Sequence, residues 1–191
     1  MADTGQKALI EAILHGDSNA YRQFIEQYKN LVAHVVFQLI PNPIDREDIC
    51  QDVFVSAYQH LKDFQYQSKI STWLARIAYF RCLNYLKKRR AVLFDDHTPE
   101  EMTFDDVASA SFDPYEDTEK KERLVLVREA LAQMPIVYRT ILTLYHLQEM
   151  SYQEIGKVME LPSGTVKSYL FRARTLLRQR LTAVNQEEDA W

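Results

Sequence analysis

The sequence contains little glycine and proline, with only four Gly and six Pro among its 191 residues. Sandwiches and barrels need turn residues between many short strands, so this scarcity argues against those folds. Alternating apolar and polar runs are also rare, whereas segments rich in Ala, Leu, Glu, Lys, Arg and Gln are common. Together these features predict an all-α protein with room for one ordinary domain or two small ones.

Long apolar runs and clustered metal ligands are missing as well. No run approaches the roughly 18 apolar residues that span a membrane, and the N-terminus has no basic-then-apolar signal pattern, so we expect a cytoplasmic protein. Cys50 and Cys82 lie far apart without a C-x-x-C pair, and the five His are scattered. We therefore expect reduced core thiols, no metal and no cofactor. The absence of a glycine-rich phosphate loop and of a nucleophile motif argues against an enzyme.

The net charge of −4 at pH 7 is unusual for a nucleic-acid-binding protein, for which a basic domain is expected. The acidic residues are concentrated in residues 93–122, which hold eleven Asp/Glu and two Lys. Residues 1–92 carry twelve Lys/Arg against nine Asp/Glu, and residues 123–191 carry nine against seven. Both flanking parts are therefore basic, and the net −9 between them predicts an acidic linker.

The alternative for residues 93–122 is a solvated acidic loop inside a single domain. About 30 residues without clear periodicity is long for such a loop, so the linker is the preferred interpretation. We predict two small helical domains, an N-terminal helical bundle at 1–92 and a helix-turn-helix domain at 123–185, followed by a tail at 186–191.

Residues 151–180 predict two helices joined by a short turn. Ser151 and Glu154 have the S-x-x-E spacing of a capping box at the start of the first helix. Leu161 and Pro162 interrupt the helical pattern, and Ser163 follows at the position of a cap for the second helix. The segment is thus expected to form a helix-turn-helix.

The second of these helices has two different faces. Its apolar residues recur at i, i+4, i+7 and i+11 and define a buried stripe: Val166, Leu170, Ala173 and Leu177. The opposite face presents short polar, cationic and aromatic groups: Gly164, Lys167, Ser168, Phe171, Arg172 and Thr175. Five Lys/Arg and no acid occur in residues 163–180. This composition suits a recognition helix in the major groove, and the alternative is a helical hairpin whose basic face is only solvated.

The N-terminal part predicts several more helices. A short amphipathic helix ends at Gly16, and Asp17 or Ser18 can cap a second helix that ends before Pro41. A third helix is expected to begin near Asp45, with four apolar residues on its inward side: Ile49, Val53, Ala57 and Leu61. Polar residues lie off that stripe: Asp48, Gln51, Asp52 and Ser56. They either complement the helix dipole or form a docking face for a basic partner.

The segment from residue 64 to residue 90 combines cations and aromatic rings. Ser71 or Thr72 is expected to cap a helix in which six Lys/Arg and no acid occur between Arg76 and Arg90. Four aromatic residues are interleaved with these cations: Trp73, Tyr79, Phe80 and Tyr85. Such interleaving is typical of a surface on which single-stranded bases stack, although packing in the core also accounts for many of the rings.

The order and spacing of these segments resemble a bacterial RNA polymerase sigma factor of the extracytoplasmic-function (ECF) group. Residues 17–40 are similar to the first helical segment of that family, and DREDICQDVFVSAYQHLKDF is similar to its polymerase-clamp helix. F-x-x-x-S-x-x-STWLARIA followed by NYL resembles its −10 segment. LAQMP-x-x-YR together with SYQEIGKVMELPSGTVKSYLFRAR resembles its −35 domain. The similarity covers nearly the whole chain.

The resemblance implies a transcription initiation factor that binds core RNA polymerase and promoter DNA, both duplex and single-stranded. It implies contacts to the polymerase from Asp48, Gln51, Asp52 and Ser56. It implies contacts to the melted −10 element from Phe64, Gln67, Ser68, Trp73, Arg76, Phe80, Asn84, Lys87 and Lys88. It implies −35 contacts from Ser163, Thr165, Lys167, Ser168, Phe171 and Arg172. An anti-sigma factor is a further implied partner.

The sequence departs from the family pattern at two places in the −10 segment. Tyr66 and Gln67 stand where many relatives carry Gly-Asp, and Phe80 stands where many carry Asn. The base preference at the −10 element is therefore not implied by the resemblance. The acidic linker suits either a basic channel of the polymerase or a fold-back on the basic DNA readers. The rival to a sigma factor is a one-component helix-turn-helix regulator, which would bind duplex DNA without polymerase.

Overall fold

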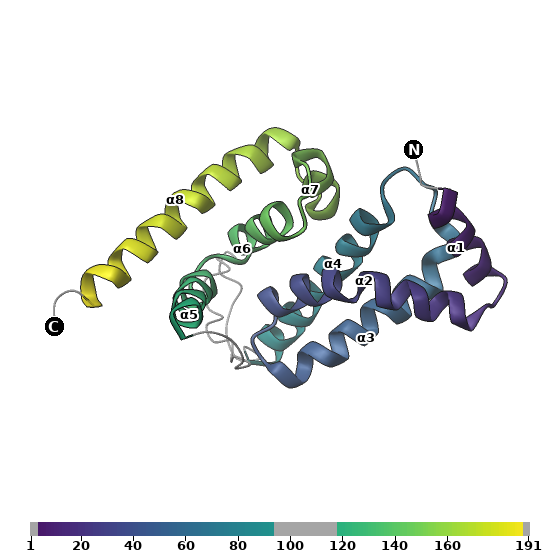
Figure 1. Ribbon diagram of the computed structural model, residues 1–191, viewed down its shortest axis with the longest axis horizontal. Helices are drawn as coiled ribbons and strands as arrows, with labels where there is room; N and C mark the ends of the chain where they lie inside the picture. The colour runs from purple at the N-terminus through teal and green to yellow at the C-terminus, as the bar shows by residue number, and fades with distance from the viewer. Residues whose placement is uncertain (1–3, 94–117, 189–191) are drawn as a thin grey trace.

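The computed structural model describes residues 4–93 and 118–188, and every regular element in those ranges is helical (Figure 1). The helices form an N-terminal unit before residue 94 and a C-terminal unit after residue 117. The all-α prediction is confirmed. Most of the predicted acidic linker lies outside the described residues, and its last residues are helical, because α5 already begins at Thr118.

The N-terminal unit packs four helices around one apolar core. They are α1 (Thr4–Leu14), α2 (Ser18–Leu39), α3 (Pro43–His60) and α4 (Ile70–Leu93), with the 3-10 turn η1 (Leu61–Asp63) after α3. The predicted inward stripe of α3 is buried as expected. The most deeply buried side chains include Phe24, Val32, Val36, Val53, Leu61, Ile70, Leu74 and Cys82. This core fixes α3 and α4 against each other, and both carry predicted functional residues.

The start of α2 confirms Asp17 as a cap. Its Oδ1 accepts hydrogen bonds from the backbone nitrogens of Asn19 at 2.8 Å and Ala20 at 3.2 Å. Gly16 precedes it with φ +89°, a left-handed conformation that glycine adopts without steric cost. The chain therefore turns sharply between α1 and α2.

Two predicted helix starts are wrong by a few residues. α3 begins at Pro43 rather than near Asp45, because Asn42 caps it and accepts a 3.1 Å hydrogen bond from the backbone nitrogen of Ile44. Proline is favoured in the first turn, where its missing N–H needs no partner. The sequence pattern located the apolar stripe correctly, but the cap lies outside that stripe.

The predicted cap of α4 at Ser71 or Thr72 is also wrong. The helix begins at Ile70, and the backbone nitrogen of Trp73 already donates to the Lys69 carbonyl at 3.1 Å. Thr72 is buried in the first turn of the helix, and its hydroxyl has no hydrogen-bond partner among the described residues. Residue type alone suggested a cap here, whereas packing of Ile70 in the core sets the start of the helix.

The C-terminal unit contains the predicted helix-turn-helix. Its helices are α5 (Thr118–Ala132), α6 (Ile136–Leu142), α7 (Tyr152–Met159) and α8 (Ser163–Glu188), with a π-helical turn η2 (Thr143–Leu147) after α6. Its core includes Ile141, Leu144, Ile155, Val158, Val166, Leu170 and Ala173. Ser163 is the first residue of α8 rather than its predicted cap, and the backbone nitrogen of Val166 donates to the Pro162 carbonyl at 3.0 Å.

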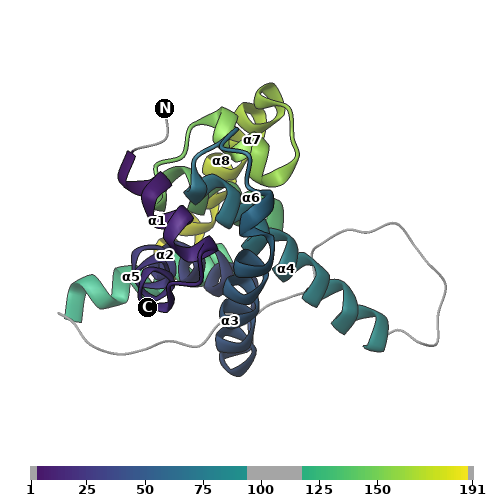
Figure 2. The ribbon, with the colours of Figure 1, turned by 90° about the vertical axis from the view of Figure 1, so that its right-hand side faces the viewer.

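The two units touch each other through α7 and α6. α7 packs on α4, while α6 and η2 pack on α2. Figure 2 shows α7 above α4, and Figure 1 shows α6 on the side of the C-terminal unit that faces α2 and α4. α8 extends away from this contact, and its far end forms the tip of the molecule opposite α1 (Figure 1). α7, the first helix of the helix-turn-helix, therefore lies between α8 and the N-terminal unit.

Candidate nucleic-acid interface

The turn between α7 and α8 is held by a capping box and by a close backbone contact. The Ser151 backbone nitrogen donates to Glu154 Oε2 at 2.9 Å, and the Glu154 nitrogen donates to Ser151 Oγ at 3.3 Å, which confirms the predicted box. Glu160 adopts the left-handed conformation at φ 58° and ends α7. A Cβ on Gly156 would lie only 2.6 Å from the Leu161 carbonyl oxygen, so the turn requires glycine at this position.

The two predicted faces of α8 are confirmed. Val166, Leu170 and Ala173 are buried, and Leu177, the last residue of the predicted stripe, is half-buried. The residues of the opposite face are exposed: Gly164, Lys167, Ser168, Phe171, Arg172 and Thr175. Ser163 is also exposed, and Thr165 is half-buried. With 72% of its surface exposed, the Phe171 ring is available to a partner. An exposed face with cations and an aromatic ring near a helix N-terminus fits entry into the major groove.

The loop between η1 and α4 is built around two aromatic rings. The Phe64 ring is buried, with its centroid 5.4 Å from that of Trp73 and 4.9 Å from that of Tyr66. Tyr66 has φ 56°, a left-handed conformation that residues other than glycine adopt only at a steric cost. Gln67 is exposed and Ser68 is half-buried, so the loop presents amides and hydroxyls around an aromatic wall.

α4 continues this surface with exposed polar side chains. Arg76, Asn84, Lys87 and Lys88 are exposed, and Phe80 is half-buried with the Arg76 guanidinium 5.7 Å from its ring centroid. Tyr79, in contrast, is a core residue, and its burial raises the pKa of its hydroxyl to about 12. The structure thus separates the four aromatic residues of this segment, because Tyr79 is buried whereas Trp73, Phe80 and Tyr85 are half-buried. Tyr85 donates its hydroxyl proton to an Asp45 carboxylate oxygen.

The exposed side of α3 carries most of the residues predicted to bind polymerase. Asp48, Gln51 and Asp52 are exposed, but Ser56 is only 7% exposed, so its place on a docking face is wrong. Ser56 lies one position from the buried Ala57, and the bundle covers both.

Two apolar residues of the same helix were missed. Val55 is 54% exposed and Tyr58 is 50% exposed. Val55 follows Asp52 by three residues and Tyr58 follows Val55 by three, so they continue the exposed side of α3. Large apolar side chains left in water next to a row of acidic and amide groups are typical of the centre of a protein interface. The signal was present in the sequence, because Val55 and Tyr58 fall outside the inward stripe of α3.

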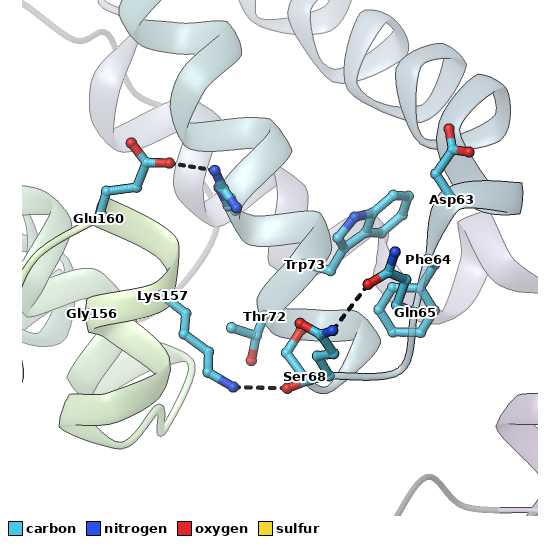
Figure 3. A pocket seen from close by; sticks show the side chains of 11 residues that line it. Asp63, Phe64, Gln65, Ser68, Thr72, Trp73, Gly156, Lys157 and Glu160 are labelled. Carbon is cyan, nitrogen blue, oxygen red and sulfur yellow. Dashed lines mark hydrogen bonds and ion pairs between the residues drawn. The ribbon is translucent and has the colours of Figure 1, made fainter.

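A cavity of about 410 Å³ lies where the two units meet, between the loop, α4 and α7 (Figure 3). Phe64, Trp73 and Arg76 line one side, and Lys157 and Glu160 line the other. No sequence pattern connects α4 with α7, so the residues on the two sides of this cavity could not be brought together from the sequence. Three polar contacts join the C-terminal unit to the loop and α4: Lys69 with Glu154, Lys157 with the Gln67 carbonyl, and Arg76 with Glu160.

The two cysteines are free thiols, as expected. Burial raises the pKa of Cys50 to about 11 and that of Cys82 further still, so both stay protonated near neutral pH. The described residues contain no group of three or more His, Cys, Asp or Glu placed to hold a metal ion. Within the same residues, none of the helices has the length and apolar character needed to cross a bilayer.

Comparison with protein families assigns each helical unit separately. The Sigma-70 region 2 family matches residues 24–92, and the Sigma-70 region 4 family matches residues 124–177. The chain is also 31% identical to the RNA polymerase sigma-H factor of Pseudomonas aeruginosa over 187 residues, which cover 94% of this chain and 95% of the relative. The chain belongs to the ECF group of bacterial sigma factors. It therefore binds core RNA polymerase and directs it to promoters.

Other relatives of this sigma factor agree with the assignment. It is 28% identical to the ECF RNA polymerase sigma factor SigW of Bacillus subtilis, over 92% of this chain and 96% of the relative. It is 31% identical to the ECF RNA polymerase sigma-E factor of Haemophilus influenzae, over 92% and 94% of the two chains. These whole-length matches favour the sigma factor over the one-component regulator that the sequence left open.

Two solved structures share the fold of this sigma factor. One is CnrH in complex with the cytosolic domain of CnrY, with a TM-score of 0.66 and 22% identity over 92% of this chain and 96% of that one. The other is the sigma factor RpoE of Bartonella quintana in complex with the anti-sigma factor NepR. It has a TM-score of 0.68 and 20% identity over 85% and 96%.

Proposed function

We propose that this sigma factor divides promoter recognition between three surfaces: α3 for the polymerase, the loop with α4 for the melted −10 strand, and α8 for the −35 duplex. The observation that supports the proposal best is that the region 2 and region 4 matches coincide with two separately packed units. Each of these units presents an exposed polar or cationic face. The proposed role involves binding and strand separation, with no bond chemistry.

The −35 reader in this proposal is the exposed face of α8. Lys167 and Arg172 supply donors for base edges or phosphates, and Ser168 adds a hydroxyl. Phe171 supplies an apolar surface for a thymine methyl group or a sugar, which explains why an aromatic ring is left in water. Ser163 and Thr165 lie at the N-terminal end, which enters the groove first.

The −10 reader combines the aromatic wall of the loop with the cations of α4. Trp73 and Phe80 offer ring surface at which each stacked base contributes roughly 1–3 kcal/mol, and this offsets the few kcal/mol needed to unpair and flip it. Gln67, Ser68 and Asn84 are placed to bond base edges, while Arg76, Lys87 and Lys88 contact phosphates. The buried Phe64 supports the Trp73 ring from behind.

The polymerase surface consists of the exposed side of α3. Asp48, Gln51 and Asp52 provide the charged and amide groups, and Val55 and Tyr58 provide the apolar centre. Docking holds two weak DNA readers at a fixed separation, so the second contact gains effective concentration from the first. Since the enzyme it serves works in the cytoplasm, we place the sigma factor there.

An anti-sigma factor is a further proposed partner. Both structural neighbours were solved with a bound protein, which in RpoE of Bartonella quintana is the anti-sigma factor NepR. The fold of this sigma factor matches theirs across both units. Co-purification with the tagged chain from its own host tests for such a protein. If polymerase subunits are the only proteins that co-purify, the proposal of an anti-sigma partner is rejected.

The test of the proposed function is transcription in vitro with added core polymerase on a genomic library. We expect a small set of start sites that share two upstream elements and that require the full chain. A gel shift without polymerase completes the test, because the proposal expects weak binding of the chain alone. Tight duplex binding by the chain alone, together with no transcription, would reject the proposal in favour of a one-component regulator.

A further inference from the structure

The cavity between the two units contains a buried hydroxyl group without a hydrogen-bond partner. Thr72 lines this cavity and is only 1% exposed, yet its Oγ1 finds neither a donor nor an acceptor among the described residues. In Figure 3 this hydroxyl points toward the end of the cavity that Ser68 and Lys157 also line. Burying a polar group without a partner is unfavourable, because the group gives up its hydrogen bonds to water. A hydroxyl at this position is therefore suited to a ligand in the cavity.

The same end of the cavity carries a positive charge that no carboxylate balances. Lys157 donates to the Gln67 carbonyl at 2.8 Å and forms no ion pair within the described residues. Arg76 differs from it, because its guanidinium pairs with Glu160. Asp63 lines the opposite end of the cavity from Lys157 (Figure 3). An ammonium beside free hydroxyl groups is a favourable environment for a phosphate group.

Aromatic rings and amides form another part of the cavity wall. Trp73 is half-buried, and the buried Phe64 ring supports it with a distance of 5.4 Å between the ring centroids. Gln65 and Gln67 line the same cavity, with Gln67 Nε2 3.0 Å from Gln65 Oε1. A flat ring that is flanked by amide donors and acceptors has the features that bind a single nucleobase, by stacking and by hydrogen bonds to its edge.

The volume of the cavity is that of a site for one small molecule. At about 410 Å³ it falls within the range of about 300–1,000 Å³ that is typical of small-molecule pockets. The aromatic wall comes from the loop and α4, whereas Gly156 and Lys157 come from α7. A molecule with a flat ring at one end and a phosphate at the other would therefore contact both units.

We propose that this cavity binds a free nucleoside monophosphate, with its base stacked on Trp73 and its phosphate held by Lys157 and the Thr72 hydroxyl. The choice of a nucleobase rests on the proposed −10 function of the loop, in which the same ring stacks an unstacked base of the promoter strand. The choice of a phosphate is independent of that function, because it depends only on Thr72 and Lys157. A bound nucleotide occupies Trp73 and therefore competes with the −10 strand, so the sigma factor responds to the level of a free nucleotide.

The binding test uses the full chain with the change Trp191→Phe, which leaves Trp73 as its only tryptophan. The probes are the four ribonucleoside monophosphates, and the matching nucleosides and inorganic phosphate serve as partial ligands. We expect at least one nucleotide to quench Trp73 fluorescence in a saturable manner. Its affinity, measured by calorimetry, should exceed that of its nucleoside by about tenfold or more, as hydrogen bonds to a charged phosphate imply.

Thr72→Val separates a ligand-binding role of the hydroxyl from a structural one, because it keeps the shape of the side chain. It should raise the midpoint of thermal unfolding by about 2–4 °C, since an unpaired buried hydroxyl is removed. It should also weaken nucleotide binding by about tenfold. The matched control is Thr140→Val, because Thr140 is also buried but donates to the Ile136 carbonyl at 2.9 Å. The control should lower the midpoint and leave the nucleotide affinity unchanged.

Lys157→Gln tests the phosphate contact. Gln retains a donor for the Gln67 carbonyl but removes the positive charge. We expect the variant to bind the nucleotide about tenfold more weakly and to bind the nucleoside as the parent does. An equal loss for the two ligands would contradict the phosphate contact. Circular dichroism verifies that every variant keeps its helix content.

Four results would overturn the proposal: no saturable binding of any nucleotide, inorganic phosphate bound as tightly as the nucleotide, an unchanged nucleotide affinity in Thr72→Val, or an equal loss of affinity in Thr140→Val. These measurements use neither polymerase nor promoter DNA. Failure of the proposed function therefore appears separately, as absent transcription with core enzyme. Nucleotide binding that depends on Thr72 and Lys157, together with absent transcription, would retain the nucleotide site and reject the proposed function.

Discussion

Phe171 is the residue whose position is hardest to explain without a partner. Its ring is 72% exposed on a helix whose other described large apolar side chains are buried or half-buried. Replacing Phe171 with Ala is expected to change the free energy of unfolding by less than about 0.5 kcal/mol, because little contact is lost. It should nevertheless weaken promoter binding by the holoenzyme, measured by anisotropy on duplex −35 DNA.

Lys167 and Arg172 test base reading at the same face. Either residue changed to Ala should cost about 1–3 kcal/mol on the cognate −35 element if it contacts bases. Arg178→Ala is the matched control, because Arg178 is exposed on the same helix but lies beyond the proposed reading face. Equal losses on cognate and scrambled −35 sequences would reduce Lys167 and Arg172 to phosphate contacts.

Gly156 is the residue on which the geometry of the turn depends. Gly156→Ala would place a methyl group 2.6 Å from the Leu161 carbonyl, so the backbone of the turn must shift. We expect a loss of about 1–3 kcal/mol in the free energy of unfolding, measured with urea. Gly164→Ala is the control, since a Cβ there meets open space and should be neutral. A Gly156→Ala variant as stable as the control would contradict the close contact.

At the scale of elements, the start of α7 is sensitive to pH. Burial alone would raise the pKa of Glu154, but the hydrogen bonds from Lys69 and Ser151 outweigh it and lower the pKa below the usual 4.5. A lowered folded pKa adds stability above the unfolded value, and that stability disappears as pH falls through the folded pKa.

The corresponding experiment compares unfolding of the parent and Glu154→Gln between about pH 6 and pH 3, a range that brackets the ordinary carboxyl pKa. The parent should lose its advantage over the variant as the pH falls below 4.5. If the free energies of unfolding of the parent and the variant change in parallel with pH, the Glu154 carboxylate contributes nothing beyond the capping that Gln retains.

The exposed side of α3 makes a prediction for polymerase binding. Asp52→Lys should weaken association with core enzyme by about 1–2 kcal/mol, and Tyr58→Ala should do the same, because both alter an interface centre. Glu26→Lys on α2 is the charge control, since Glu26 is exposed and pairs only with the nearby Lys29 among the described residues. Measurement is by competition with a labelled sigma factor, and an equal effect in the control would remove α3 from the interface.

At the scale of the whole molecule, the acidic linker is predicted either to follow a basic channel of the polymerase or to fold back on the basic DNA readers. Asp95, Asp96, Asp105 and Asp106 lie outside the described residues. If the linker folds back, changing these four residues to Asn should raise the affinity of the free chain for promoter DNA at low salt, measured by fluorescence anisotropy. An unchanged affinity at low salt would reject the fold-back.

The helices and their faces were largely predictable from the sequence. Apolar spacing located the buried stripes of α3 and α8, and the capping box located the start of α7. The predicted starts of α3 and α4 differ from the observed ones. The Asn42 cap sets the start of α3, and α4 begins at Ile70, which is packed in the core. Ser56 was misplaced, because a residue at the edge of a stripe is exposed or buried according to what packs beside it.

The sequence by itself determined the all-α fold, two basic helical units and the cationic face of α8, because periodicity and charge are local properties that survive without tertiary contacts. Only the tertiary structure decided that α7 rests on α4 and that Glu154 and Glu160 meet Lys69 and Arg76. Those residues lie more than 80 positions apart in the chain. No local pattern records which helices meet, since that depends on how the apolar surfaces of both units fit together.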